Sequence, residues 1–296
     1  MKLVCIPAFN EEKTIGEIVE KSLQYADNVI VCNDGSTDNT EKKAKEKGAI
    51  IINHKKNLGY GAAIISLFEE ARKQNAEIMV TLDGDGQHDP AEIPNLVKAL
   101  IENKVDVVIG SRFLGKKTNY PVYRKTGIKI ITSASNLGTD FKVTDSQSGF
   151  RVYSKKAIDL IHPTEEGMSA STEILLKISN WDLSVAEVPI TISYEGETST
   201  HKPVPQGISV LMNTLKFISV KHPITFYGLP GIALVIAGVV LGIQFLDEYL
   251  NDQTIFYGSL LGSVILFLVG AIMLATAIIL YSMATLMSDR KWQRIL

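Results

Sequence analysis

Apolar segments with strand character alternate with amphipathic segments of helix character through the first 110 residues of this chain. The expected strands are residues 2–9, 29–32, 50–53, 78–83 and 105–110. The expected helices between them are residues 12–25, 40–47, 61–74 and 90–102. Strands that are apolar throughout and separated by helices are typical of a largely parallel sheet covered on both faces. We therefore expect an α/β domain.

Each expected strand is followed by a loop rich in polar residues and glycine. These loops begin at Pro7, Asn33, Asn57, Asp83 and Gly110. Ligands bind to open α/β sheets in the crevice at the carboxyl ends of the strands, so five such loops predict one shared site. The loops match neither the G-x-G-x-x-G fingerprint of dinucleotide-binding folds nor the P-loop.

The fourth loop has the strongest chemical signal. Asp83, Asp85 and Gln87 follow an apolar strand at alternate positions, separated by two glycines. Carboxylate and amide oxygens are suited to Mg²⁺ or Mn²⁺, and such sites leave open positions that substrate phosphates fill. A solvated Asp-Gly turn is the alternative interpretation of this run alone. His88 follows directly and is expected to be structural rather than a ligand.

The second and third loops are suited to a nucleotide diphosphate. Asn33 and Asp34 have short polar side chains that can hydrogen-bond a base or a ribose. Gly59 and Gly61 allow close backbone approach at the start of a helix, where an anion is favoured. A cation held by the fourth loop would neutralise the diphosphate as it leaves.

Two long uncharged segments near the C-terminus predict membrane spans. Residues 225–246 and 254–287 each exceed the roughly 20 residues that a bilayer requires. The connector, residues 247–253, is short and acidic, whereas the outer flanks are basic, with Lys216 and Lys221 before and Arg290, Lys291 and Arg294 after. The positive-inside rule therefore predicts that the N-terminal domain and both termini are cytoplasmic. A buried helical hairpin of a soluble protein is the alternative.

Residues 208–220 show helical spacing of apolar side chains just before the first span. We expect this helix to lie in the membrane interface, and a core-facing helix is the alternative. The predicted domains are 1–204, a cytoplasmic α/β domain; 205–222, an amphipathic interfacial helix; and 223–296, a membrane anchor with two transmembrane helices.

Composition limits the classes of partner that this chain is expected to bind and the state of its cysteines. The net charge of −2 provides no basic field, so no nucleic-acid partner is expected. Cys5 and Cys32 lie in apolar strand-like runs, which favours buried reduced thiols over a disulfide or a metal pair.

Together these loops resemble the inverting family-2 glycosyltransferases of the GT-A fold, in the group of dolichol-phosphate mannose synthases and polyprenyl-phosphate glucosyltransferases. The resemblance covers about the first 200 residues in order. Its motifs are Pro7-Ala8-Phe9-Asn10-Glu11-Glu12, Asn33-Asp34-Gly35-Ser36-Thr37-Asp38, Asn57-Leu58-Gly59-Tyr60-Gly61, Asp83-Gly84-Asp85-Gly86-Gln87-His88, Gly110-Ser111-Arg112 and Asp145-Ser146-Gln147-Ser148-Gly149-Phe150-Arg151. The two C-terminal apolar segments are also similar to the anchors of that group.

The resemblance implies a Rossmann-like GT-A domain and a reaction. A nucleotide-diphosphate sugar would transfer its hexose, with inversion and with Mg²⁺ or Mn²⁺, to polyprenyl or dolichyl phosphate in the bilayer. The product would be a lipid-linked sugar donor for glycan assembly or protein glycosylation. UDP-glucose, UDP-N-acetylglucosamine and GDP-mannose remain open as donors, and two spans rather than four favour a UDP-sugar by family analogy.

The resemblance also implies residue roles. Nucleotide-sugar contacts are implied for Pro7, Phe9, Asn10, Glu11, Asn33, Asp34, Asn57, Gly59, Gly61, Asp83, Gly84 and Asp85. Acceptor-phosphate contacts are implied for Arg112 and Arg124, with Lys202 adding positive charge near the headgroup or diphosphate. The implied catalytic set is Asp85, Arg112, Arg124, Arg151 and Glu173. A surface salt bridge is the alternative for each arginine, and a stabilising helix N-terminal carboxylate is the alternative for Glu173.

Three positions depart from the family pattern. Tyr60 stands where many relatives have a basic residue, Ile128 where a hydroxyl is frequent, and Asn33 where an aspartate is frequent. The first puts the third loop's phosphate contact in question, and the second puts one acceptor contact in question. None removes a metal ligand.

The same residues bear on other functions. A processive polysaccharide synthase would need more spans and a Q-x-x-R-W motif, and neither Trp181 nor Trp292 lies in one. A non-catalytic membrane scaffold that binds sugar nucleotides would be marked by loss of a metal ligand or of Arg112, and all are present. That scaffold, and a family-2 transferase acting on another membrane acceptor, stay as alternatives.

Overall fold

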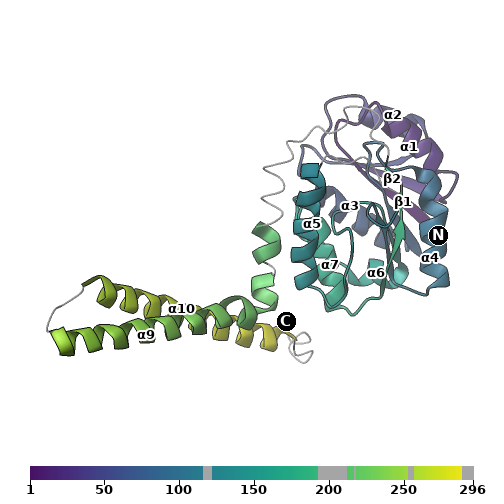
Figure 1. Cartoon of the computed structure of the whole chain (residues 1–296). Coiled ribbons are helices and arrows are strands. Elements are labelled where there is room, and N and C mark those ends of the chain that lie inside the picture. The colour runs from purple at the N-terminus through teal and green to yellow at the C-terminus, as the bar shows by residue number, and fades with distance from the viewer. Residues whose placement is uncertain (116–121, 193–211, 217, 253–256, 289–296) are drawn as a thin grey trace. The chain divides into compact units, whose positions relative to one another are not determined.

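The computed structural model describes residues 1–115, 122–192, 212–216, 218–252 and 257–288 (Figure 1). The chain divides into two compact units, Met1–Thr214 and Leu215–Leu296. Of the predicted interfacial segment, residues 205–211 and 217 lie outside the described residues, and so does Lys202.

The first unit is built on a seven-stranded sheet with the order β3-β2-β1-β4-β6-β5-β7. Its strands are β1 (Lys2–Ala8), β2 (Asn28–Asn33), β3 (Ile50–Asn53), β4 (Ile78–Thr81), β5 (Val107–Ser111), β6 (Arg151–Ser154) and β7 (Val185–Pro189). β6 runs antiparallel to both β4 and β5, and the other strand pairs are parallel. The predicted largely parallel α/β sheet is therefore confirmed.

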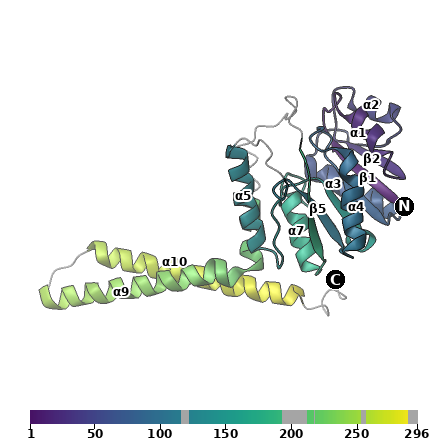
Figure 2. The same ribbon diagram turned by 45° about the vertical axis from the view of Figure 1, so that its right-hand side comes forward.

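Helices cover both faces of this sheet, because alternate side chains of the buried strands point to opposite sides. Leu3 and Cys5 pack on the face covered by α3 (Tyr60–Lys73), α6 (Lys155–Leu160) and α7 (Ala170–Asn180). Val4 and Ile6 pack on the face covered by α1 (Ile15–Ser22), α2 (Thr40–Glu46) and α4 (Ile93–Glu102). α5 (Val122–Leu137) lies beside α7 (Figure 2). Cys5 and Cys32 are buried free thiols, as predicted.

Two predicted helices have different bounds in the structure. The first begins at Ile15 rather than at residue 12, because the backbone N–H groups of Glu11 and Glu12 donate to the side chains of Thr40, the first residue of α2, and of Asp38 in the second loop. The fourth is divided into a 3₁₀ turn, η1 (Pro90–Glu92), and α4. Asp89 accepts a hydrogen bond from the backbone of Ala91 and so caps that turn.

The second unit is a helical hairpin of η2 (Ile224–Gly228), a π-helical turn, followed by α9 (Leu229–Asp252) and α10 (Tyr257–Ser288). Both long helices are apolar enough to cross a membrane, and only 11% and 17% of their most apolar windows are buried. A helical hairpin in the core of a soluble protein would be mostly buried, so this exposure favours membrane spans over that alternative. The prediction of an acidic connector is also corrected, because α9 continues to Asp252. No glycine or proline interrupts residues 243–252 to end the helix earlier.

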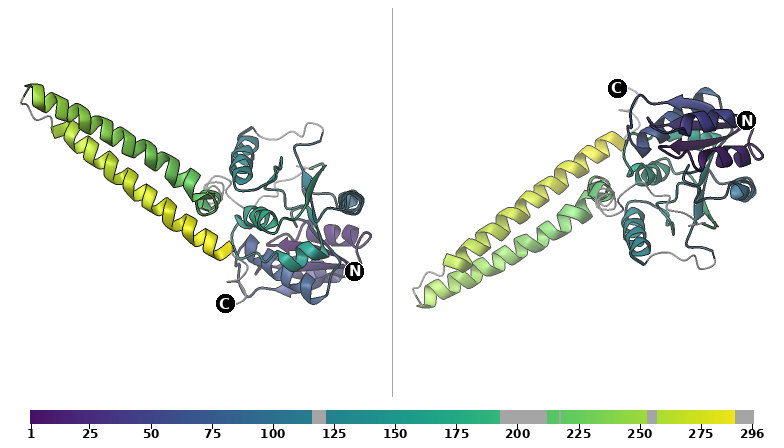
Figure 3. Two further views of the ribbon diagram at one scale, coloured as in Figure 1. Left: turned by 90° about the horizontal axis from the view of Figure 1, so that it is seen from below. Right: turned by 90° about the horizontal axis from the view of Figure 1, so that it is seen from above.

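Small residues bring α9 and α10 close together, and the two helices run side by side in both views of Figure 3. A Cβ on Gly238 would lie 2.7 Å from the backbone nitrogen of Phe267. A Cβ on Gly270 would lie 2.7 Å from the carbonyl oxygen of Gly231. Such close backbone approach is a common way for helices to associate in lipid, where burial from water provides no driving force.

Candidate active site

The strand directions bring the predicted loops to one edge of the sheet. β1, β2, β3, β4 and β5 all point the same way, so their carboxyl ends lie together. Because β6 is antiparallel, its first residue, Arg151, lies at this edge as well. The five loops and the motif that precedes β6 therefore share one crevice edge, as predicted for the five loops.

Hydrogen bonds join the first and second loops. The Asn10 N–H donates to Ser36 Oγ at 3.0 Å, and the Thr37 N–H donates to Asn10 Oδ1 at 2.9 Å. Asn10 has a positive φ of 57°, a conformation that asparagine tolerates better than most residues. Pro7 is buried at the end of β1, and Phe9 is half-buried.

The second loop is fastened to the third by Asp34, whose residue is only 3% exposed. Its carboxylate accepts hydrogen bonds from the N–H groups of Leu58 at 3.0 Å and Gly59 at 2.8 Å, and lies 2.6 Å from His54 Nδ1. Asn33 likewise bonds within the protein: its Nδ2 donates to Asn53 Oδ1 at 2.8 Å. These bonds use three of the roughly four acceptor positions of the Asp34 carboxylate, so Oδ2 can still accept one further hydrogen bond, as from a ribose hydroxyl.

The two glycines of the third loop contact protein backbone. A Cβ on Gly59 would lie 2.6 Å from the carbonyl oxygen of Glu166, and one on Gly61 would clash with that of Glu165. The Ala62 N–H donates to the Glu166 carbonyl at 3.1 Å. The segment 165–167 thus lies against the start of α3, where the sequence predicted an anion. Asn57, in the same loop, is exposed.

The fourth loop contains a carboxylate oxygen that accepts no hydrogen bond from the described residues. Asp83 Oδ1 is buried and has no hydrogen-bond partner among the described residues. Gly149 lies so close that any Cβ there would clash with the Asp83 carboxylate. The Thr81 hydroxyl donates to the carbonyl of Gly149 at 2.7 Å and holds that contact in place. A bound ion or water is one way in which such a buried oxygen is satisfied, and a cation suits a carboxylate oxygen.

Three carboxylates crowd this point, and burial is the largest cause of a raised pKa in each. Burial, and then the charge of Asp85, raise the pKa of Asp83 to about 7, although Arg112 and Arg151 oppose the shift. Burial, and then Asp85, raise the pKa of Glu11 to about 7 as well. Burial also raises the pKa of Asp85. A divalent cation would stabilise the ionised forms of all three groups.

The oxygen atoms of this loop suit a hard cation that takes some of its ligands from the protein and the others from water and a substrate. Gln87 is half-buried, and its backbone N–H donates to Asp85 Oδ1 at 3.0 Å, which orders this turn. Within the described parts of the chain, no three His, Cys, Asp or Glu side chains are gathered closely enough to hold a metal. Mg²⁺ typically uses one or two carboxylates and completes its shell with water and phosphate oxygens.

His88 packs beneath the fourth loop. Its residue is 4% exposed, its ring lies 5.4 Å from that of Phe150, and Nε2 is 3.8 Å from Asp83 Oδ2. Burial, followed by the charge of Arg112, lowers its pKa to about 3. A neutral packing residue agrees with the structural interpretation made from the sequence.

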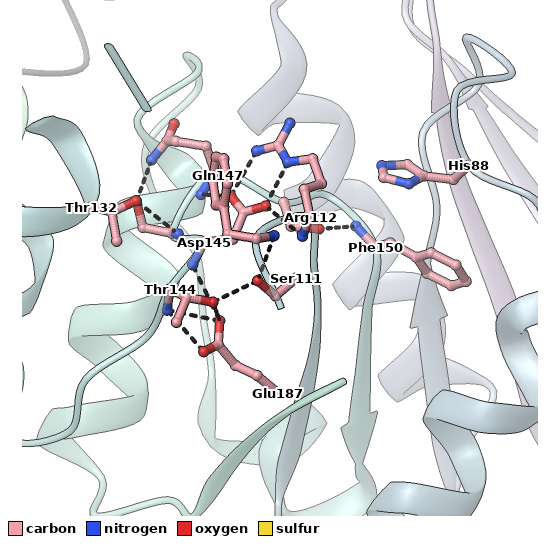
Figure 4. Close-up of polar contacts among 12 residues, drawn as sticks. His88, Ser111, Arg112, Thr132, Thr144, Asp145, Gln147, Phe150 and Glu187 are labelled. Atoms are coloured by element: carbon pink, nitrogen blue, oxygen red, sulfur yellow. Dashed lines mark hydrogen bonds and ion pairs between the residues drawn. The ribbon is translucent and has the colours of Figure 1, made fainter. Parts of the chain in front are cut away.

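Arg112 is fixed by a buried partner that the sequence interpretation missed (Figure 4). Its Nε and Nη2 donate to the two oxygens of Asp145 at 2.5 and 2.7 Å. Asp145 is fully buried, and Glu187 accepts hydrogen bonds from the N–H groups of Thr144 and Asp145. The available signal was the position of Asp145, which opens the motif that ends in Arg151.

Arg151 is buried and bonded to backbone. Its guanidinium donates to the carbonyls of Ser148 at 2.8 Å, Ser171 at 3.2 Å and Ser146 at 2.8 Å. These bonds shape the loop that presses Gly149 against Asp83. Arg151 therefore acts on the site through loop shape and through its positive charge.

Glu173 lies in the first turn of α7 and is 3% exposed. Its carboxylate accepts hydrogen bonds from the N–H groups of Thr164 and Glu165 and pairs with Lys177 at 3.0 Å. It thereby fastens the segment that lies against α3. These contacts favour the stabilising role over the catalytic one.

The remaining positions complete the site. Arg124 lies in α5, and its side chain, like Lys202, is outside the described residues. Tyr60 is an electrostatic neighbour of Asp83, and burial and then the charge of Asp83 raise the pKa of its hydroxyl. The tyrosine thus lies near the carboxylate cluster rather than supplying a basic group there. Ile128 is half-buried.

Comparison with known proteins gives consistent matches. Residues 3–161 match the family described as Glycosyl transferase family 2. The chain is 34% identical over 229 residues to the UDP-N-acetylglucosamine–dolichyl-phosphate N-acetylglucosaminyltransferase of Methanococcus voltae, which covers 70% of this chain and 89% of the relative. It is 33% identical over 200 residues to the dolichol-phosphate mannosyltransferase of Pyrococcus furiosus, which covers 64% of this chain and 55% of the relative.

A solved structure has the same fold. The glucosyl-3-phosphoglycerate synthase of Mycobacterium tuberculosis, crystallised with Mn²⁺, UDP and glucosyl-3-phosphoglycerate, matches with a TM-score of 0.58 and 19% identity. The match covers 75% of this chain and 79% of that one. At this identity the likeness concerns the fold alone, and it confirms the predicted GT-A architecture.

Proposed function

This chain belongs to glycosyl transferase family 2, and from that membership we propose that it transfers a hexose from a nucleotide-diphosphate sugar to polyprenyl or dolichyl phosphate. Two relatives named above act on dolichyl phosphate, which supports the acceptor. The observation that carries the proposal is the Asp83 oxygen that no described residue hydrogen-bonds, which lies within a carboxylate cluster near an arginine held by Asp145. A cation site and a phosphate-binding group at one edge are what such a transfer requires.

Asp83 and Asp85, with Gln87 beside them, would hold the divalent cation. The oxygen donors favour Mg²⁺ or Mn²⁺, and the Mn²⁺ and UDP in the solved structure of the same fold support a metal. When bound, the cation would neutralise charge that develops on the departing diphosphate. The cross-linked first, second and third loops would hold the nucleotide, with Asp34 and Asn33 fixing their shape.

Arg112 would hold the acceptor phosphate. That phosphate is already anionic near neutral pH, so transfer needs little help from a general base. The larger difficulty is to bring an anion beside a diphosphate, and a guanidinium oriented in advance reduces it. Asp145 supplies that orientation, because it binds Arg112 through two parallel hydrogen bonds. Arg124 and Lys202 would add positive charge.

The helical hairpin would anchor the enzyme in the membrane that holds its lipid acceptor. The basic flanks support a cytoplasmic active site, with residues 1–204 as the transferase domain, 205–222 as the interfacial helix and 223–296 as the anchor. Anchoring confines the enzyme and polyprenyl phosphate to one surface, so the acceptor is met by diffusion within the bilayer.

A donor panel tests this function. Membranes containing the full chain would be incubated with radiolabelled UDP-glucose, UDP-N-acetylglucosamine or GDP-mannose, and acid-labile lipid would be counted. We expect label from one donor, and loss of label in Asp85→Ala. Asp89→Asn is the matched control, because Asp89 is an exposed carboxylate that caps η1. Absence of lipid label from every donor would favour the non-catalytic scaffold.

A further inference from the structure

Thr14 occupies the N-cap position of α1 but does not cap the helix. Threonine at this position ordinarily satisfies a free N–H of the first turn through its side-chain oxygen. Here the side chain makes no capping hydrogen bond.

The Thr14 hydroxyl reaches the fourth loop instead. Oγ1 donates to the carbonyl oxygen of Gly84 at 2.7 Å, across 70 residues of sequence. The carbonyl of Glu11 also lies 3.3 Å from this hydroxyl, which has one proton to donate. The shorter contact, to Gly84, is the stronger bond.

The methyl group of Thr14 supports the other side of the same turn. Gly86 has a φ of +77°, and a Cβ built on it would lie 3.0 Å from Thr14 Cγ2. Gly84 and Gly86 flank Asp85, so one threonine contacts the backbone on both sides of that aspartate. The turn is otherwise open to distortion, since both of its flanking residues are glycine.

We infer that Thr14 is a positioning residue for cation binding: its hydroxyl and methyl group bracket Asp85 and preset the carboxylate for a divalent metal. This inference rests on the proposed metal-dependent function. Groups that orient metal ligands without touching the metal commonly change affinity by about 10- to 100-fold when removed.

The test measures Mn²⁺ binding to the full-length protein in detergent, by electron paramagnetic resonance of free Mn²⁺, without substrate or turnover. Thr14→Val keeps the shape and removes the hydroxyl, so we expect affinity to fall about tenfold. Thr139→Val is the matched control, because the Thr139 hydroxyl also donates to a backbone carbonyl at 2.7 Å, that of Phe141, away from the fourth loop. Its Mn²⁺ affinity should equal that of wild type.

A second pair keeps the test decisive if the valine variant does not fold. Thr14→Ser and Thr14→Ala both lose the methyl group and differ only in the hydroxyl, so the serine variant should bind Mn²⁺ more tightly. Equal affinities in this pair, or wild-type affinity in a folded Thr14→Val, would overturn the inference. Asp85→Ala distinguishes failure of the inference about Thr14 from failure of the proposed metal site. Undiminished Mn²⁺ binding by Asp85→Ala would refute the metal assignment itself, and the inference with it.

Discussion

Arg112 has both a fixed geometry and a charge that faces the carboxylate cluster. Removing a bidentate arginine–phosphate contact should cost on the order of 2–4 kcal/mol of transition-state stabilisation. We therefore expect Arg112→Ala to slow transfer by roughly 30- to 1000-fold. Calorimetry with the nucleotide sugar should show nearly unchanged donor affinity, because the first three loops and the metal ligands are untouched. Loss of donor affinity with normal turnover at saturating donor would instead place Arg112 at the diphosphate.

Asp145 should affect use of the acceptor rather than of the donor, as Arg112 does, because it orients Arg112 in this scheme. Asp145→Asn keeps the size of the side chain but weakens the two charge-assisted bonds. We expect the KM for polyprenyl phosphate to rise and the KM for the donor to stay constant. A change at a hydrogen-bonded pair elsewhere, Ser179→Ala beside the exposed Asp140, should leave both values unchanged. Equal effects on both substrates would mean that Asp145 merely stabilises the fold.

The carboxylate cluster makes metal binding depend on pH. Asp83 and Glu11 have folded-state pKa values raised to about 7, above their usual values of 3.8 and 4.5. Protons therefore compete with the cation below neutral pH, and Mn²⁺ affinity should rise from about pH 5.5 and level off above about pH 8. Titrations of free Mn²⁺ at a series of pH values check this.

The same shifts affect the stability of the metal-free protein. The folded state holds these protons up to a higher pH than the unfolded state does, so the cluster destabilises the fold least at low pH. The free energy of unfolding therefore falls as pH rises from about 4 through about 7. His88 opposes this trend: its lowered pKa removes stability as pH falls below about 6.5. Asp83→Asn should therefore melt higher than wild type near pH 8 and equally near pH 4. The difference in Tm between the two proteins isolates the cluster.

At the scale of elements, the hairpin depends on glycine at the contact between α9 and α10. Gly238→Leu would drive a side chain into the backbone of Phe267 and Ser263, and overpacking of this kind typically costs about 1–3 kcal/mol. Gly262→Leu is the matched control on α10, because a Cβ there meets nothing within 4 Å. We expect thermal stability in detergent to fall for the first variant only. Similar losses in both variants would show that the observed helix contact is not the stabilising one.

At the scale of the whole molecule, the basic flanks and the apolar hairpin predict one topology. Cysteine at Asn251, at the end of α9, should react with an impermeant thiol reagent added outside intact cells. Cysteine at Lys104, an exposed residue of the α/β unit, should react only after permeabilisation. The native Cys5 and Cys32 are fully buried, so they should contribute little labelling of their own. Labelling of both sites from the same side would exclude two spans.

Much of this molecule could be predicted because its signals are local. The period of apolar residues along the chain reports strand or helix, and long uncharged runs report membrane spans. Since parallel strands end at one edge, the alternation of strands and helices was enough to assign the loops after β1 to β5 to one site. The bounds of α1 and α9 were less predictable. Long-range loop contacts make α1 begin later than its sequence pattern predicts, and no residue in the sequence ends α9 where its apolar segment ends.

Only the tertiary structure decided which side chains face each other. The family resemblance singled out Arg112, Arg151 and Glu173, but did not indicate that Asp145 would bind the first or that the other two would bond to buried backbone groups. The glycines of the third loop, Gly59 and Gly61, predicted a place for an anion, whereas segment 165–167 occupies that helix start. Arg112 and Asp145 are 33 residues apart, and the insertion of antiparallel β6 between β4 and β5 brings the motif that contains Asp145 to the site. Local periodicity has no information about contacts of that range, because they depend on strand order and on how loops pack once the sheet has formed.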